Sequence, residues 1–332
     1  MTQVSCITDL FNYEKDRADH IQSCGGSIEG FTTKHGMLLQ RELEGNKALT
    51  AHLVMPDSIK GIELASGVRK ALGQSLDTPL PPSKPISSDD VSKARSFVRD
   101  LLGQDLSDVA VIHASARVMR DTSFGTVYSC GPTNHLIVVP ESHFDPVGLL
   151  VHQFAIAAHY TAMRKGSAIG SMVSDSVTQS MIGHYASLQW FCQNDRSLLL
   201  PHLRNMVRWE FATGLGRTAT YPMGFIVSDL GVSLLKDFGG EMFRSIVSEL
   251  YESMPDGRAM WFGTNSFIGC ALALIFFDCP GGIRKFISLD TGDKTLQEKL
   301  ELAGLEVGAQ PVESCNKALM SMIDSSESAR IQ

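Results

Sequence analysis

The residues best suited to chemistry lie in the middle of the chain, on a segment with the apolar periodicity of a helix, 147–164. His152 and His159 are seven residues apart, so both side chains would lie on one helix face. Seven residues span about 10 Å along the axis, whereas zinc binds nitrogen at about 2.0–2.1 Å. These two histidines cannot share one ion on a straight helix, so a metal site here needs ligands from another segment.

A second helical segment, 173–193, offers such ligands. It carries Asp175 and His184, which could join His152 or His159 if the two helices cross favourably. Other roles are open for these residues. Asp175 lies between two serines and is suited to cap the helix, and His184 is suited to packing between helices. Histidines on an apolar helix stripe usually pair with a carboxylate or carbonyl in the core, an alternative that applies to His152 and His159.

The elements that must position these residues can be predicted from pattern. Two short β-branched runs, 109–113 and 135–139, are typical of strands. Asp145 followed by Pro146 is typical of a helix start, just before the segment with the histidines. Further helices are predicted at 91–102, 197–212, 225–251 with a break near Gly239, 266–277, 281–288 and 295–303. The sequence therefore predicts a mostly α-helical α+β protein.

Composition divides the chain and excludes some functions. The proline- and serine-rich segment 79–90 predicts a connector between an irregular or helical N-terminal region, 1–78, and a main domain, 91–323, with a disordered tail at 324–332. The net charge of −7 and the lack of basic runs argue against nucleic-acid binding. The longest apolar run, 267–277, is too short to cross a membrane. Seven scattered cysteines and no signal-peptide pattern predict a soluble cytoplasmic protein.

The order strand, short loop, helix, second helix also carries a family resemblance. The segment Val151-His152-Gln153-Phe154-Ala155-Ile156 and the later Ser174-Asp175-Ser176 resemble the active-site helices of gluzincin metallopeptidases, which carry an H-E-x-x-H motif on the first helix. The resemblance covers roughly residues 106–190. It implies a zincin-like active-site helix packed on a small sheet and followed by a helical C-terminal region.

The same resemblance implies that the catalytic site is degenerate. In this class two histidines one turn apart and a carboxylate from the second helix hold zinc, and a glutamate activates the bound water. Here His152 stands at the first ligand position and Asp175 at the third, so these two are the candidate metal ligands. Gln153 replaces the glutamate base, and Ile156 replaces the second histidine. We therefore expect no bound cofactor, with zinc as the alternative.

The resemblance further implies a binding cleft beside the first helix. The strand 135–139 resembles the edge strand that such enzymes lay against a substrate, which an extended peptide could join by main-chain hydrogen bonds. Tyr221 falls where some zincins place a side chain that steadies the oxyanion, although a turn residue is the alternative. The expected cleft is lined by His135, Val138, His152, His159, Asp175 and His184.

These features lead to one functional expectation and two alternatives. We expect a metallopeptidase-like pseudoenzyme that does not cleave peptides and instead binds a peptide or protein partner. The first alternative is a hydrolase or other enzyme with a rearranged site in the same cleft. The second is a helical interaction protein unrelated to zincins. Stoichiometric metal would favour the first alternative, and a fold without a sheet beside the His152 helix would favour the second.

Overall fold

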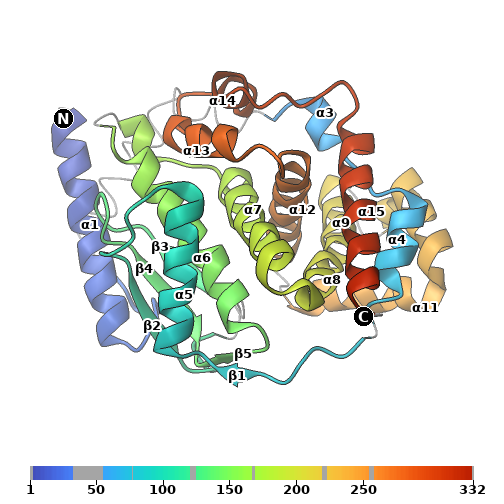
Figure 1. Ribbon diagram of the computed structural model, residues 1–332, viewed down its shortest axis with the longest axis horizontal. Coiled ribbons are helices and arrows are strands. Elements are labelled where there is room, and N and C mark those ends of the chain that lie inside the picture. Colours follow the sequence, from blue (N-terminus) through green and yellow to red (C-terminus); the bar gives the residue numbers. More distant parts are fainter. Residues whose placement is uncertain are drawn as a thin grey trace. The chain divides into compact units, whose positions relative to one another are not determined.

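The computed structural model describes residues 3–32, 55–76, 78–119, 125–166, 169–218, 223–253 and 258–330. These residues form a mostly helical α+β fold with two small sheets, as the sequence predicts (Figure 1). Among the described residues, none of the helices combines the length and the apolar character needed to cross a membrane.

The chain forms two compact units that are not consecutive in sequence. Unit 1 comprises residues 1–56, 81–187 and 278–306, and unit 2 comprises residues 57–80, 188–277 and 307–332. The chain passes from unit 2 to unit 1 between Leu80 and Pro81, and this boundary lies within the predicted connector. The other boundaries between the units differ from the predicted domain boundaries. The segment 57–80, predicted as part of the N-terminal region, and the last helix both belong to unit 2.

Unit 1 contains both sheets and the helices around them. Its main elements are α1 (Gln3–Ser23), β1 (Lys84–Pro85), α5 (Ser88–Leu102), β2 (Ala110–Ala114), β3 (Thr126–Tyr128), β4 (Leu136–Pro140), β5 (Ser142–His143), α6 (Pro146–Met163), the first part of α7 (Ser176–Asn194), α13 (Pro280–Leu289) and α14 (Leu296–Ala303). The helices predicted at 91–102, 147–164, 173–193, 281–288 and 295–303 are confirmed to within a few residues.

The larger sheet has three strands in the order β2-β4-β3. β4 pairs with β2 in parallel, with Ala110 opposite Leu136, and with β3 in antiparallel fashion, with Tyr128 opposite Leu136. The predicted strand 135–139 is therefore β4, but the prediction that it forms an edge was wrong. β3 covers that side of it, and β3 escaped prediction because a strand of three residues shows no clear alternation of apolar and polar side chains.

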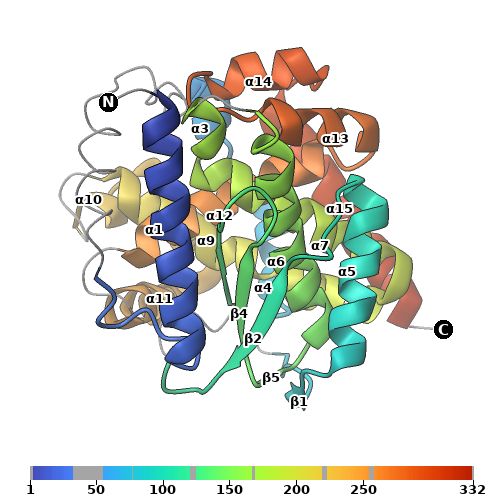
Figure 2. The ribbon, with the colours of Figure 1, turned by 90° about the vertical axis from the view of Figure 1, so that its left-hand side faces the viewer.

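The two faces of this sheet are covered by different helices. α1 lies beside the sheet formed by β2 and β4 (Figure 2). On that face Leu136 and Val138 of β4 form a buried cluster with Ala18 and Ile21 of α1. Alternate residues of a strand point to opposite faces, so Ile137 and Val139 point towards α6, which contacts β3 and β4. α6 begins as the sequence predicts: Pro146 occupies its first turn, and Oδ1 of Asp145 accepts a hydrogen bond from the Gly148 amide at 3.0 Å.

The N-terminal helix α1 is more regular than the irregular or helical region predicted for 1–78. Its buried positions Glu14, Ala18 and Ile21 follow a helical stripe, but one member of that stripe is charged, which hides the apolar periodicity. Glu14 forms an ion pair with Arg164 inside unit 1. The two terminal guanidinium nitrogens of Arg164 each donate to one carboxylate oxygen of Glu14 at 2.7 Å. This two-point ion pair attaches α1 to the end of α6.

Among its described residues, unit 2 contains helices and connecting segments and no strand. It contains α3 (Asp57–Lys60), α4 (Ser66–Gly73), the rest of α7, α8 (Leu199–Leu203), α9 (Asn205–Arg217), α10 (Met223–Ile226), α11 (Asp229–Ser253), α12 (Arg258–Ile275) and α15 (Pro311–Arg330). The predicted break near Gly239 is confirmed, because this residue has φ 76° inside α11. The segment 324–330, predicted to be disordered, is instead the end of α15. Burial of Met322, Ile323 and Ser326 continues the core-facing stripe of that helix into the polar sequence.

Candidate functional site

His152 of α6 packs against α7 around Gly183. A Cβ atom at Gly183 would come within 2.6 Å of His152 Nε2, so the imidazole lies directly on the α7 backbone at this glycine. The His184 ring is 5.0 Å away between centroids, and Ser187 Oγ lies 3.4 Å from His152 Nδ1. Burial lowers the pKa of His152 to about 4, against the opposing effect of a hydrogen bond with the Gly183 backbone. The imidazole is therefore neutral near pH 7.

Gln153, which follows His152, and Ile156, one helical turn later, lack the functional groups that a zinc peptidase needs at these positions. The Gln153 side chain is 4% exposed and lies beside β3, with Cδ 3.6 Å from the position of a Cβ at Gly125. A carboxamide cannot accept a proton from water at neutral pH. Ile156 is half-buried and has no donor atom. The three motif positions that carry the chemistry, His152, Gln153 and Ile156, thus provide one nitrogen ligand and no base.

His159 belongs to a different cluster, deeper in unit 1. Its Nε2 atom lies 2.8 Å from Oδ2 of Asp290, in the loop between α13 and α14, and both side chains are fully buried. Ser174 Oγ donates to the same carboxylate oxygen at 2.6 Å. Serine, histidine and aspartate are together here, but the hydroxyl bonds to the aspartate instead of the imidazole. This arrangement does not activate the serine as a nucleophile.

Asp175 and Lys299 complete this buried cluster. Asp175 caps α7: its Oδ1 accepts from the Thr178 amide at 2.7 Å, and its Oδ2 accepts from the Thr178 hydroxyl at 2.6 Å. The ammonium of Lys299, on α14, forms a short ion pair with Asp290 Oδ1 and lies 3.7 Å from Asp175 Oδ2. Burial acts to raise the pKa of Asp290, but its hydrogen bond and charge interactions with His159 and Lys299 outweigh burial and hold that pKa below its usual range.

The predicted meeting of His152 with Asp175 was therefore wrong. His152 contacts α7 at Gly183, eight residues after Asp175, which is about 12 Å along a helix. Asp175 takes the capping role that the sequence left open, and His159 takes the carboxylate-paired role. A zinc ion does not fit the positions that the resemblance implies. His152 and Asp175 lie apart, Ile156 cannot ligate, and Asp175 already holds a helix end and a lysine.

The other expected cleft residues are also separated. Val138 faces α1 in the buried cluster on the far side of the sheet from α6. His135 is buried beside Tyr160, with ring centroids 5.6 Å apart, and its Nδ1 accepts from the Cys130 amide at 3.1 Å. Burial, together with the charge of Arg164, lowers the pKa of His135 to about 3. The six residues proposed to line one cleft thus do not line a single one. His152 lies with His184, His159 and Asp175 belong to the cluster of Asp290 and Lys299, and His135 and Val138 lie elsewhere. Tyr221 lies outside the described residues.

Sequence reasoning missed Asp290 and Lys299. Asp290 lies 131 residues after its partner His159 in the sequence, and Lys299 lies 124 residues after its partner Asp175. Residues this far apart in sequence show no local spacing pattern. They become neighbours only because α13 packs against α6 and α14 packs against α13. A weak signal exists in Thr295, which begins a capping box with Glu298 and thereby fixes the helix that carries Lys299.

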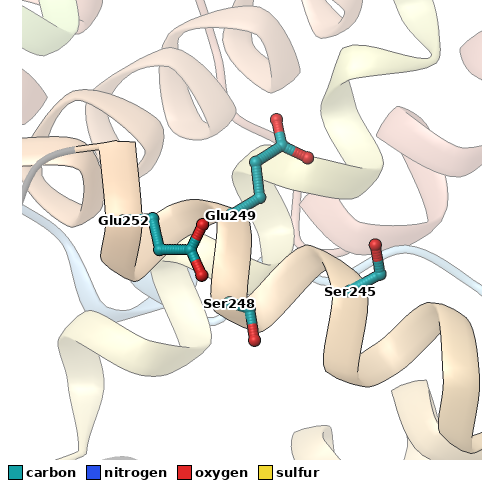
Figure 3. A pocket seen from close by; sticks show the side chains of 4 residues that line it. All are labelled: Ser245, Ser248, Glu249 and Glu252. Atoms are coloured by element: carbon teal, nitrogen blue, oxygen red, sulfur yellow. The ribbon is translucent and has the colours of Figure 1, made fainter.

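Surface hollows offer no better site among the described residues. One is lined by Ser245, Ser248, Glu249 and Glu252, all from α11, and these side chains project from one helix without converging on a point (Figure 3). Glu249 is exposed and paired with Arg208 at 3.2 Å. Another hollow lies along α14, at Lys294, Glu298, Glu301 and Leu302. Neither combines a nucleophile or base with an enclosed space.

Comparison with known proteins gives one informative match. No family model and no curated protein matches the chain by sequence. Among solved structures, the fold is similar to a crystal structure of a protein assigned as an oligoendopeptidase F from Bacillus anthracis, with a TM-score of 0.56 and 11% identity. The match covers 96% of this chain and 69% of that one. At this identity the likeness concerns the fold alone, and the chain has a peptidase-like fold similar to that of this oligoendopeptidase F.

Proposed function

We propose that this protein binds a peptide or protein through a peptidase-like scaffold and does not hydrolyse it. The observation that carries the proposal is Gln153, which stands at the position of the catalytic base and is buried against β3. Water activation needs a proton acceptor and a Lewis acid. Gln153 cannot supply the first, and the contacts of His152, Ile156 and Asp175 do not support the second.

The edge available for a peptide is β3, not β4. Within the described part of the sheet, β3 pairs only with β4, and all three of its residues are partly exposed. It starts next to Gly125, which lies beside Gln153 of α6. An extended segment added to β3 would therefore run past the helix that carries His152 and Gln153. Main-chain hydrogen bonds give such binding its affinity without any catalytic group.

Hydrogen exchange tests the binding mode directly. The probe is a pool of synthetic ten-residue peptides with blocked termini and randomised sequences, mixed with the purified full chain. Binding should slow amide exchange at 126–128, while peptides recovered after incubation keep their original masses. The control region is β2 on the opposite edge of the sheet, where exchange should stay unchanged. Stoichiometric zinc together with cleaved peptides would overturn the proposal in favour of a hydrolase with a rearranged site.

A further inference from the structure

The cluster around Lys299 presents a cation inside unit 1. The Lys299 side chain is 0% exposed, and its ammonium lies between the carboxylates of Asp290 and Asp175. The remaining oxygen of Asp290 faces His159 Nε2 at 2.8 Å and Ser174 Oγ at 2.6 Å. Four segments meet at this point: α6, the start of α7, the loop after α13, and α14.

A positive charge is required at this position on electrostatic grounds. Lysine is almost never fully buried unless it is paired, and the fully buried carboxylate of Asp290 is costly without a cation near it. The shift of the Asp290 pKa to below its usual range agrees with a carboxylate that is kept charged by its neighbours. The geometry therefore describes a buried cation with two anionic partners, not a chance contact of surface charges.

The ammonium lies against two carboxylates, and an imidazole and a hydroxyl contact the other oxygen of Asp290. All of these groups are ligand types for divalent metal ions. Carboxylate oxygens, an imidazole nitrogen and a hydroxyl suit ions such as Mn²⁺ and Zn²⁺. A metal ion placed at the ammonium would meet Asp290 and Asp175 directly, and it would have His159 and Ser174 on the other oxygen of Asp290. Apart from Asp175, this set is distinct from the residues on which the proposed function rests, His152, Gln153 and Ile156.

We propose that Lys299 is the built-in cation of a carboxylate–imidazole site, and that it holds the place a divalent metal ion would take. The lysine makes the site independent of metal supply and joins α14 to the start of α7. Once the ammonium is removed, the vacated position binds a divalent cation through Asp290 and Asp175.

The test removes the ammonium and keeps the rest of the side chain close to its original length. Lys299→Met should lower the midpoint of thermal unfolding by about 5–15 °C, because it leaves buried carboxylates without their cation. Adding Mn²⁺ or Zn²⁺ alone should recover several degrees, a gain that exceeds any seen with the parent at the same concentration. The matched control is Lys285→Met on α13, where the lysine is exposed; it should neither lose stability nor gain from metal.

A second variant keeps the inference testable if Lys299→Met does not fold. In Lys299→Met with Asp175→Asn, one negative charge is removed along with the ammonium, and asparagine still caps α7. This double variant should fold without metal and should show no metal-dependent gain. The proposal is overturned if Lys299→Met is as stable as the parent, if it is destabilised but indifferent to both ions, or if the double variant also fails to fold.

Discussion

In the proposed function, a carboxamide at position 153 and an aliphatic side chain at position 156 stand where the resembled metallopeptidases carry a base and a zinc ligand. Each removes a different contribution: Gln153 removes the proton acceptor, and Ile156 removes a ligand atom. His152 remains, but its half-buried, neutral imidazole lies on the α7 backbone at Gly183, beside His184. The neighbour that could replace a missing ligand is therefore His184, and Asp175 is too far along α7 to do so.

This geometry predicts the outcome of rebuilding the motif. Gln153→Glu with Ile156→His places two imidazoles one turn apart on α6, and His184 offers a third nitrogen next to His152. We expect the double variant to bind zinc more tightly than the parent, measured by competition with a chromogenic chelator. Adding His184→Ala should remove the gain, whereas Asp175→Asn should leave it. The opposite pattern would restore Asp175 as the third ligand position.

Buried neutral histidines also set the response of the fold to acid. The pKa of His135 falls from 6.5 to about 3 in the folded chain. Between these values the unfolded chain binds a proton that the folded chain does not, so stability is full above pH 6.5 and is lost as the pH falls towards 3. The loss amounts to about 1.4 kcal/mol per pH unit for one such group.

Replacing His135 should therefore flatten the acid side of the stability profile. In His135→Asn the amide oxygen can still accept from the Cys130 amide, but the side chain does not titrate. Urea unfolding at pH 7 and pH 5 should give a smaller difference in unfolding free energy for this variant than for the parent. Equal differences would mean that His135 is already protonated in the folded chain at pH 5.

At the scale of elements, the sequence predicts long helices well and short strands poorly. The periodic segments that became α5, α6 and α7 were predicted to within a few residues, because each combines an apolar stripe with a recognisable start. β3 has three residues and no such pattern. Because β3 was not predicted, the central strand β4 was predicted to be an edge strand. α1 was hidden by Glu14, whose partner Arg164 is 150 residues away.

The position of β3 depends on a glycine with a left-handed backbone. Gly125 has φ 78°, and a Cβ there would lie 2.8 Å from the Val138 carbonyl oxygen on β4. Gly125→Ala should therefore displace β3, speed amide exchange at 126–128 and weaken peptide binding. Gly103→Ala is the matched control, because Gly103 has φ 69° but open space around its Cβ position.

Both substitutions carry the strain of a left-handed alanine, about 1–2 kcal/mol. Only Gly125→Ala adds a backbone clash beside the proposed binding edge, so it should lose more unfolding free energy than Gly103→Ala. If the two variants lose the same stability and both retain β3 protection, the sheet tolerates the side chain and β3 is not fixed by Gly125.

At the scale of the whole chain, the candidate site could be predicted only in part because its charges are supplied from distant segments. The sequence placed His152 and His159 on one helix correctly, whereas Asp175, predicted within the next helix, lies just before it and caps it. The sequence could not show which partners each would find, because Asp290 and Lys299 follow more than a hundred residues later. The same holds for unit 2, where Arg69 of α4 pairs with Glu210 of α9 at 2.8 Å and both side chains are buried. Contiguous domains were predicted for a chain whose units are assembled from separated segments.

This interleaving predicts the behaviour of a chain cut at the expected domain boundary. A fragment that begins at residue 91 lacks Arg69 and therefore leaves Glu210 buried without its guanidinium; burial already acts to raise the pKa of that carboxyl. It also lacks Glu14, the partner of Arg164 in unit 1. Losing one member of a buried pair costs about 3–5 kcal/mol, comparable to much of the stability of a typical domain. We expect the fragment to lack a cooperative transition in urea that the full chain shows by circular dichroism. A fragment with the parent's midpoint would establish 91–332 as an independent folding unit.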